Sequence, residues 1–229
     1  MLWSARFSSS DPTVTGPAQM KFFTPAEVSA HNTRDDLWVC VLGRVLDLTE
    51  LAQKNKDEAL LLPLLESAGK DISHWFDPET KDVCLFVDQV TQCRRYYTPR
   101  GRFVDVPPPG PRSDWACEHS TPWWRDQRYC IGLLSHKTRF IRVVNTLTGQ
   151  EQRLEVCSEE TLAAILDRYL PYNNHAHSYT WRHAGSDLDM GATLEENGIH
   201  DDDHLLHQLG LHDDALCPAL LLHFTDDLS

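Results

Sequence analysis

The stretch "DDLWVCVLGRVLDLTELAQKNKDEALL", Asp35 to Leu61, holds two short apolar runs separated by a glycine. The first run, "LWVCVL", is apolar at every position, which is typical of a strand that is buried on both faces. Gly43 favours a tight turn into "VLDL", which we interpret as a second strand. Thr49 is then a suitable N-cap for a short helix, "ELAQK". The stretch therefore predicts a β-hairpin and a short helix that ends in the polar run "QKNKDE".

Helix signals lie on both sides of this hairpin. Upstream, Thr24, Pro25 and Glu27 form a capping box with proline in the first helical turn, so a short helix is expected there. Downstream, "ALLLPLLESAGKDISHWF" predicts a helix that is broken at Pro63. A second helix is predicted from about residue 71 to residue 76.

These segments together resemble the cytochrome b5-like haem/steroid-binding domain, from Phe23 to about Val106. The resemblance implies a small α+β fold that holds haem iron between two axial histidines. Carried over residue by residue, the first axial histidine falls on Asn55 and the second falls near Lys81. The companion glycines of the first ligand fall on Asp57 and Glu58. Neither asparagine nor lysine is an ordinary axial ligand of haem iron, so haem binding is expected to be conditional at most.

His74, in "ISHWF", is the histidine nearest to these positions in the sequence, about two helical turns before the second ligand position. Two interpretations remain open at this point. In the first, His74 caps or packs on the small core and the domain has no histidine-ligated iron. In the second, His74 is a haem ligand and the domain senses haem or redox state.

A segment rich in proline and tryptophan follows the first domain. It contains three consecutive prolines, which favour an extended conformation, and three indoles at Trp115, Trp123 and Trp124. The indoles are candidate protein-binding anchors, because buried aromatic residues dominate many interfaces. The alternative is that they pack back onto the flanking domains. We interpret residues 107–137 as a bridge in either case.

The C-terminal part predicts a second α+β domain. "TRFIRVVNTLTGQEQRLEV" alternates like two strands of a hairpin, with Gly149 at the turn. "SEETLAAILDRYLPY" predicts an amphipathic helix with Ser158 as its N-cap. Strand signals follow in "SYTWRHAGSDLDM" and "ALLLHF", so the order is β-β-α-β-β. This order and the motif "TLEENGI" resemble ubiquitin-like β-grasp domains, from Thr138 to Leu228.

The sequence therefore divides into an N-terminal tail (1–20), a cytochrome b5-like domain (21–106), a Trp/Pro-rich bridge (107–137) and a ubiquitin-like domain (138–229). The fold class is α+β. The last residues, "FTDDLS", lack the Gly-Gly tail that conjugation requires, and no lysine follows Lys137. We expect the second domain to recognise proteins and not to be conjugated to them.

Charge limits the partners. The chain has a formal net charge of −13, and residues 138–229 carry 5 basic and 16 acidic side chains, a net charge of −11. Such a chain disfavours nucleic acid as a partner, because it has no basic stripe to displace counterions. A basic protein surface suits the C-terminal part. No apolar run is long enough for a membrane span, and the seven cysteines show no metal-binding spacing, so free thiols are expected.

No motif of an enzyme is present: the sequence has no P-loop, GxGxxG, HExxH or GxSxG. The domain order, together with "SHWFDP", "YTPRGRFVDVPP" and "RYLPYN", resembles a family of two-domain proteins of the motile cilium. The resemblance implies a non-enzymatic component of the axoneme that is associated with the radial spoke, in the cytoplasm and cytoskeleton. Two alternatives remain open: a redox-dependent haem sensor in cilia and a b-type electron carrier.

Overall fold

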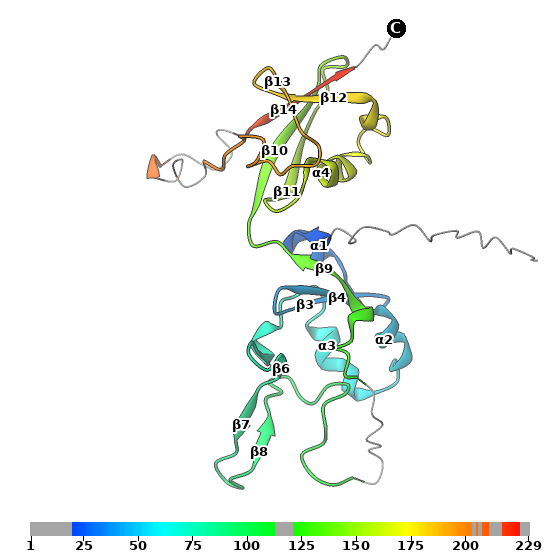
Figure 1. Ribbon diagram of the computed structural model, residues 1–229. Helices are drawn as coiled ribbons and strands as arrows, with labels where there is room; N and C mark the ends of the chain where they lie inside the picture. Colours follow the sequence, from blue (N-terminus) through cyan, green and yellow to red (C-terminus); the bar gives the residue numbers. More distant parts are fainter. Residues whose placement is uncertain (1–19, 113–120, 203–204, 206–207, 211–216, 225–229) are drawn as a thin grey trace, which may run out of the picture.

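The computed structural model describes residues 20–112, 121–202, 205, 208–210 and 217–224. They form two α+β units, one above the other in Figure 1, with helix α1 and strand β9 between the two main bodies. The first unit extends from residue 20 to the end of β9, and the second begins at β10. Across these described residues, no helix combines the length and the apolar character that crossing a membrane requires.

The first unit is built on a five-stranded sheet with the order β1-β9-β4-β3-β2. The strands are β1 (Phe22–Phe23), β2 (Asn32–Thr33), β3 (Asp36–Val41), β4 (Arg44–Asp47) and β9 (Cys130–Leu134). The predicted hairpin is confirmed, because β3 pairs with β4 in antiparallel register through a turn at Leu42 and Gly43. Both turn residues have positive φ, 50° and 77°, as the tight hairpin turn requires.

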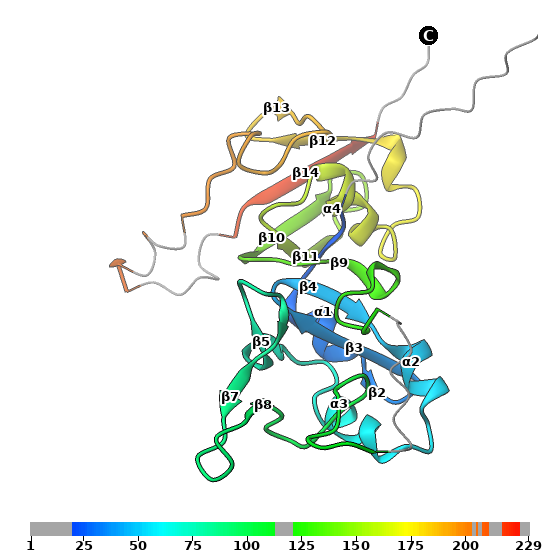
Figure 2. The same cartoon turned by 60° about the horizontal axis from the view of Figure 1, so that its bottom comes forward.

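Short helices cover this sheet (Figure 2). They are α1 (Pro25–Ala30), α2 (Thr49–Lys54) and α3 (Leu62–Glu66), with 3₁₀ turns at Ala59–Leu61 (η1), Ser73–Trp75 (η2) and Gln127–Tyr129 (η3). The capping box of α1 is confirmed, since Thr24 and Glu27 exchange both expected hydrogen bonds.

Three local helix predictions are wrong in detail. Pro63 lies in the first turn of α3 instead of breaking a helix, because an N-terminal turn needs no amide donor at that position. Residues 71–76 hold only the turn η2. The cap of α2 lies at Leu48, and the hydroxyl of Thr49 accepts a hydrogen bond from the Leu37 amide at 3.1 Å instead.

The predicted bridge is not a separate linker. Phe103, Trp123 and Trp124 belong to the same buried cluster as the β3–β4 hairpin and the helices. Strand β9 then completes the sheet: it runs antiparallel to β4 and parallel to β1. Residues 107–112 and 121–134 are therefore part of the first unit, which changes the predicted domain boundary at residue 106.

The second unit has the strand order β11-β10-β14-β12-β13. Its elements are β10 (Thr138–Asn145), β11 (Glu151–Cys157), α4 (Leu162–Tyr169), η4 (Ala176–Ser178), β12 (Tyr179–His183), β13 (Ser186–Asp187) and β14 (Ala219–Phe224). If the five strands of this unit are numbered along the chain, their order across the sheet is 2-1-5-3-4. The first strand, β10, and the fifth, β14, are parallel. That arrangement is the predicted β-grasp. The N-cap of α4 is Thr161 and not Ser158, because the Thr161 side chain accepts the amide of Ala164.

Two small antiparallel pairs complete the first unit: β5 (Phe76–Asp77) with β6 (Asp82–Val83), and β7 (Leu85–Val87) with β8 (Arg94–Tyr96). The β7–β8 hairpin extends from the end of the first unit that is farthest from the second unit (Figures 1 and 2).

Candidate functional site

The first predicted iron-ligand position is occupied by a helix-ending side chain. Asn55 is the C-cap of α2, and its backbone amide donates to the Leu51 carbonyl at 3.1 Å. Its side-chain amide donates to the same carbonyl at 2.8 Å. Asn55 therefore closes the last turn of α2 through the Leu51 carbonyl, which is a structural role.

The other two predicted positions lie on the surface. Lys81 is exposed in the β5–β6 turn, with φ of 54° and a backbone hydrogen bond to the Asp77 carbonyl at 2.8 Å. His74 is exposed on η2, where its ring meets the Trp75 ring edge-on at a centroid distance of 6.0 Å. The structure thus supports surface packing for His74 and gives no buried ligand environment for either residue.

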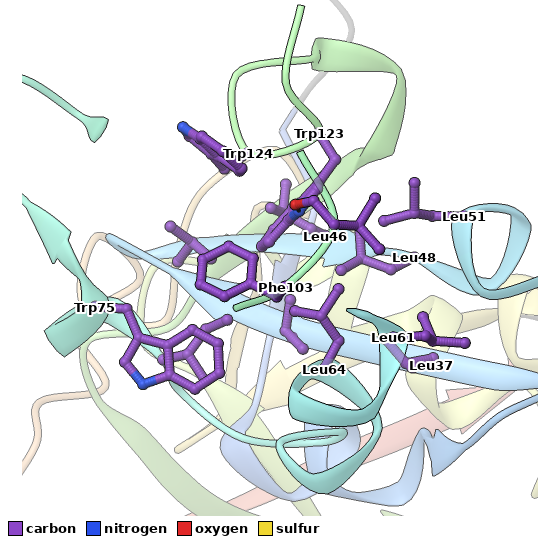
Figure 3. Close-up of a cluster of buried hydrophobic side chains, with 14 of the residues drawn as sticks. Leu37, Leu46, Leu48, Leu51, Leu61, Leu64, Trp75, Phe103, Trp123 and Trp124 are labelled. Carbon is purple, nitrogen blue, oxygen red and sulfur yellow. Dashed lines mark hydrogen bonds between the residues drawn. The ribbon is translucent and has the colours of Figure 1, made fainter. Parts of the chain in front are cut away.

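Aromatic rings of the chain itself lie in the buried core of this unit, next to several leucines (Figure 3). Trp123 and Trp124 are 1% and 3% exposed, and their rings lie 5.4 Å apart in an edge-to-face contact. Phe103 lies 6.0 Å from the Trp123 ring and 5.2 Å from the Trp75 ring. Such contacts add to the hydrophobic stabilisation of the core. We call Trp75, Phe76, Phe103, Trp123 and Trp124 the aromatic cluster.

Both indole N–H groups of the former bridge have partners inside the first unit. Trp123 Nε1 donates to the Val104 carbonyl at 3.1 Å, and Trp124 Nε1 donates to Asp82 Oδ1 at 3.0 Å. The prediction that these two residues are protein-docking anchors is therefore wrong, because burial leaves no ring face for a partner. Trp115 lies outside the described residues.

Haem, the ligand that the resemblance implies, does not fit the residues present. Asn55 is committed to capping α2, and Lys81 and His74 face solvent. The aromatic cluster belongs to the buried core that the sheet and the helices share. Within the described part of the chain, no three His, Cys, Asp or Glu side chains gather to hold a metal ion either.

A second candidate site lies at the junction of the two units, where Arg168 of α4 reaches the N-terminal part of the first unit. Its Nε donates to Glu160 at 2.8 Å, and its Nη2 donates to the Phe22 carbonyl at 3.0 Å. Its Nη1 also donates to Glu27, the residue that completes the capping box of α1. One guanidinium therefore ties a strand and a helix of the first unit to the second.

The burial of this ion network is unusual for charged groups. Arg168 is 12% exposed and Glu160 is 4% exposed. Burial alone would lower the pKa of Arg168, but the hydrogen bonds and charges of Glu160 and Glu27 outweigh it, so the pKa is raised. Arg168 is charged at any working pH. The sequence does not indicate this network, since the capping box accounts for Glu27 and no local motif includes Arg168.

The buried thiols are not nucleophiles. Burial, together with the charge of Glu160, raises the pKa of Cys157 to about 12, although Arg168 acts in the opposite direction. Burial, together with Asp71, raises the pKa of Cys40 to about 12. A thiol reacts as its thiolate, so both groups are inert near neutral pH. The six cysteines in the described part of the chain are free thiols.

An open groove of about 950 Å³ lies beside the Arg168 network, between α1 of the first unit and β11 and α4 of the second. Its walls carry more acidic than basic side chains. The carboxylates are Glu27, Glu155, Glu159, Glu160 and Asp167, and the cations are Lys21, Arg153 and Arg168. The groove therefore suits a positively charged partner better than an anionic one.

Comparison with known proteins confirms the first domain. The family model described as "Cytochrome b5-like Heme/Steroid binding domain" matches residues 24–82. A ubiquitin of Caldiarchaeum subterraneum is 17% identical with a TM-score of 0.30, covering 41% of this chain and 100% of that chain. The β-grasp assignment rests on the strand order instead. The fold defines a two-domain protein, in which a cytochrome b5-like domain precedes a ubiquitin-like one.

Two relatives match almost the whole chain. Cytochrome b5 domain-containing protein 1 of Homo sapiens is 55% identical over 211 residues, which is 92% of this chain and 92% of the human protein. The Xenopus tropicalis protein of the same name is 52% identical over 213 residues, 93% of this chain and 98% of its own. This chain therefore belongs to the cytochrome b5 domain-containing protein 1 family. Neither name gives an enzymatic activity.

Proposed function

We propose that this chain is a non-enzymatic structural adaptor of the motile ciliary axoneme, associated with the radial spoke and supporting coordinated beating. The observation that carries the adaptor role is that the family's ligand positions hold Asn55 and Lys81, in a domain whose buried core contains the aromatic cluster. A domain without two stable axial ligands is unsuited to reversible electron transfer. What remains is a folded body that presents surfaces to other proteins.

The Arg168 network supports this role. An adaptor must hold its binding surfaces at a fixed spacing, and Arg168 joins the two units through buried, charge-assisted hydrogen bonds. The ciliary location is supported by the domain order and by the motifs "SHWFDP" and "RYLPYN", which resemble those of ciliary two-domain proteins.

The acidic groove supplies the first surface for a partner. We propose that a basic protein segment of the axoneme lies against it, because the groove walls carry five carboxylates against three cations. Complementary charge at a rim changes the association rate and its salt dependence more than the affinity itself.

The test is reconstitution of the purified full-length chain on demembranated axonemes from cells that lack it. We expect saturable retention that weakens as salt is raised. Asp167→Lys, inside the groove, should slow association, whereas Asp202→Lys makes the same charge change at an exposed position outside the groove lining and should not. An absence of saturable retention of the native chain would contradict the axonemal role.

The haem-sensor and electron-carrier alternatives predict a different result in a simpler experiment. With stoichiometric haem added, we expect no sharp low-spin Soret band in the absorption spectrum, oxidised or reduced. A sharp band that His74→Ala removes would favour the sensor. A sharp band that His74→Ala leaves unchanged would show that other ligands hold the iron.

A further inference from the structure

The β7–β8 hairpin displays apolar side chains that the rest of the molecule leaves uncovered. All three residues of β7, Leu85, Phe86 and Val87, are about half exposed, and Val90 at the tip is 91% exposed. The register pairs Phe86 with Arg95 and Val87 with Arg94. Directly paired residues share a face of the sheet, so each face combines an apolar and a cationic side chain.

Hydrogen bonds order the hairpin at its base and at its tip. At its base, the Cys84 amide donates to the Trp75 carbonyl at 2.8 Å, and the Tyr97 amide donates to the Cys84 carbonyl at 2.7 Å. At its tip, the Asp88 carboxylate accepts the amides of Val90 and Thr91, each at 2.9 Å. These bonds order the hairpin backbone at its base and its tip, and an ordered segment loses less conformational entropy on binding.

The hairpin has no third strand in the part of the chain that the structure describes. An exposed apolar edge is a site for pairing with another chain, and natural proteins usually cover or charge such edges. An isolated two-stranded pair is also only marginally stable in water. These features are understandable if the hairpin is covered by a partner in the working assembly.

Charge indicates what kind of partner. The hairpin, residues 85–96, contains two arginines and one aspartate, a net charge of +1 in a chain whose net charge is −13. Of these arginines, Arg95 pairs with Asp88 at 3.2 Å, and Arg94 is exposed beside Val87. The hairpin therefore carries a small net positive charge, with Arg94 exposed, and is opposite in sign to the acidic groove.

We infer that the β7–β8 hairpin is a docking arm for a protein partner that offers an apolar groove with an acidic rim. This inference rests on the proposed adaptor function and deepens it: the chain has a basic, apolar arm at one end and an acidic groove between its two units. A lipid surface fits less well, because apolar side chains lie on both faces of the hairpin and the tip is otherwise polar. Asp88, Gln89, Thr91 and Gln92 surround Val90 there.

The test compares two exposed apolar residues at hairpin tips. Val90→Ser changes the arm, and Leu147→Ser, at a position that is 68% exposed in the β10–β11 turn, is the matched control. On axonemes that lack the native chain, Val90→Ser should lose roughly tenfold or more in affinity, as truncation of an interface anchor does, and Leu147→Ser should bind like the native chain. Arg94→Glu should weaken binding too, and most strongly at low salt.

The possible results distinguish a protein partner from a second copy of the chain and from a membrane. Equal binding of native chain and Val90→Ser overturns the docking arm and leaves the adaptor function standing, whereas no binding of the native chain overturns both. Sedimentation of the native chain alone tests a second copy: self-association that Val90→Ser abolishes would replace the proposed partner. Binding to phosphatidylserine vesicles that Val90→Ser abolishes would replace it with a membrane. Circular dichroism and thermal unfolding confirm that each variant is folded.

Discussion

Arg168 and Asp105 show how single buried charges act differently in this molecule. Arg168 has two carboxylate partners and a backbone carbonyl, so its charge is compensated although its side chain is largely buried. Asp105 has one backbone donor, the Trp123 amide at 2.9 Å, and burial raises its pKa in spite of that bond. The charge of Arg168 joins the two units, whereas ionisation of Asp105 costs free energy.

Replacing Arg168 with methionine should lower the free energy of unfolding by about 3–5 kcal/mol, because Glu160 is then left buried without its partner. Thermal or urea unfolding measures the change. Arg182→Met is the control: its ion pair with Asp187 is exposed, so the loss should stay below about 1 kcal/mol. Similar losses in both variants would show that the Arg168 network stabilises the protein no more than an exposed ion pair does.

Asp105→Asn should stabilise the protein at pH 7. A raised pKa in the folded state means that the acid form contributes stability below the unfolded value, near 3.9, and that this stability is lost as the pH rises through the folded value. Asparagine keeps an acceptor for the Trp123 amide and tolerates the φ of 69° at this position. The melting temperature of the variant should exceed that of the native chain at pH 7, and the difference should shrink as the pH is lowered and vanish below about pH 3.9. A constant difference across this range would exclude a titration effect.

At the scale of elements, β9 decides how the first unit closes. It lies between β1 and β4 in the sheet, and its middle residue is Gly132. A Cβ atom at Gly132 would lie 2.3 Å from the Lys21 carbonyl oxygen and 2.7 Å from the Phe23 ring. The close approach of β1 and β9 therefore requires glycine there.

Gly132→Ala should lower the free energy of unfolding of the first unit by about 1–3 kcal/mol, because the added methyl group overpacks the β1–β9 contact. Gly110→Ala is a suitable control, since a Cβ there would meet nothing within 4 Å. Thermal unfolding followed by tryptophan fluorescence reports on this unit. Equal melting temperatures in the two variants would mean that β1 shifts freely.

At the scale of the whole molecule, the first unit needs two successive segments of the chain to complete its core and its sheet. Residues 22–106 supply the β3–β4 hairpin and the helices, and residues 121–134 supply two indoles of the aromatic cluster and strand β9. Phe103, in the first of these segments, joins them: its ring contacts Trp75 of the same segment and Trp123 of the second.

A fragment of residues 20–136 should therefore fold cooperatively, whereas a fragment of residues 20–106 should not. Loss of Trp123 alone, as in Trp123→Ala, should cost about 3–5 kcal/mol, because the cavity it leaves lies among the rings of the cluster. Near-ultraviolet circular dichroism and cooperative urea unfolding distinguish the fragments. A stably folded fragment 20–106 would restore the boundary that composition suggests.

Local sequence patterns were sufficient to predict many of the short-range features of this protein. The capping box at Thr24 and Glu27, the tight turn at Gly43 and the buried face of α4 follow from patterns within a few residues, and the structure confirms them. The absence of histidine at residues 55 and 81 was likewise evident from the sequence.

Only the tertiary structure decided that Trp123 and Trp124 are core residues, because an aromatic anchor looks the same in sequence whether its own domain or another protein covers it. The same holds for Arg168, whose partner Glu27 is 141 residues away: long-range pairing is set by how the two units pack, and no local pattern contains that information.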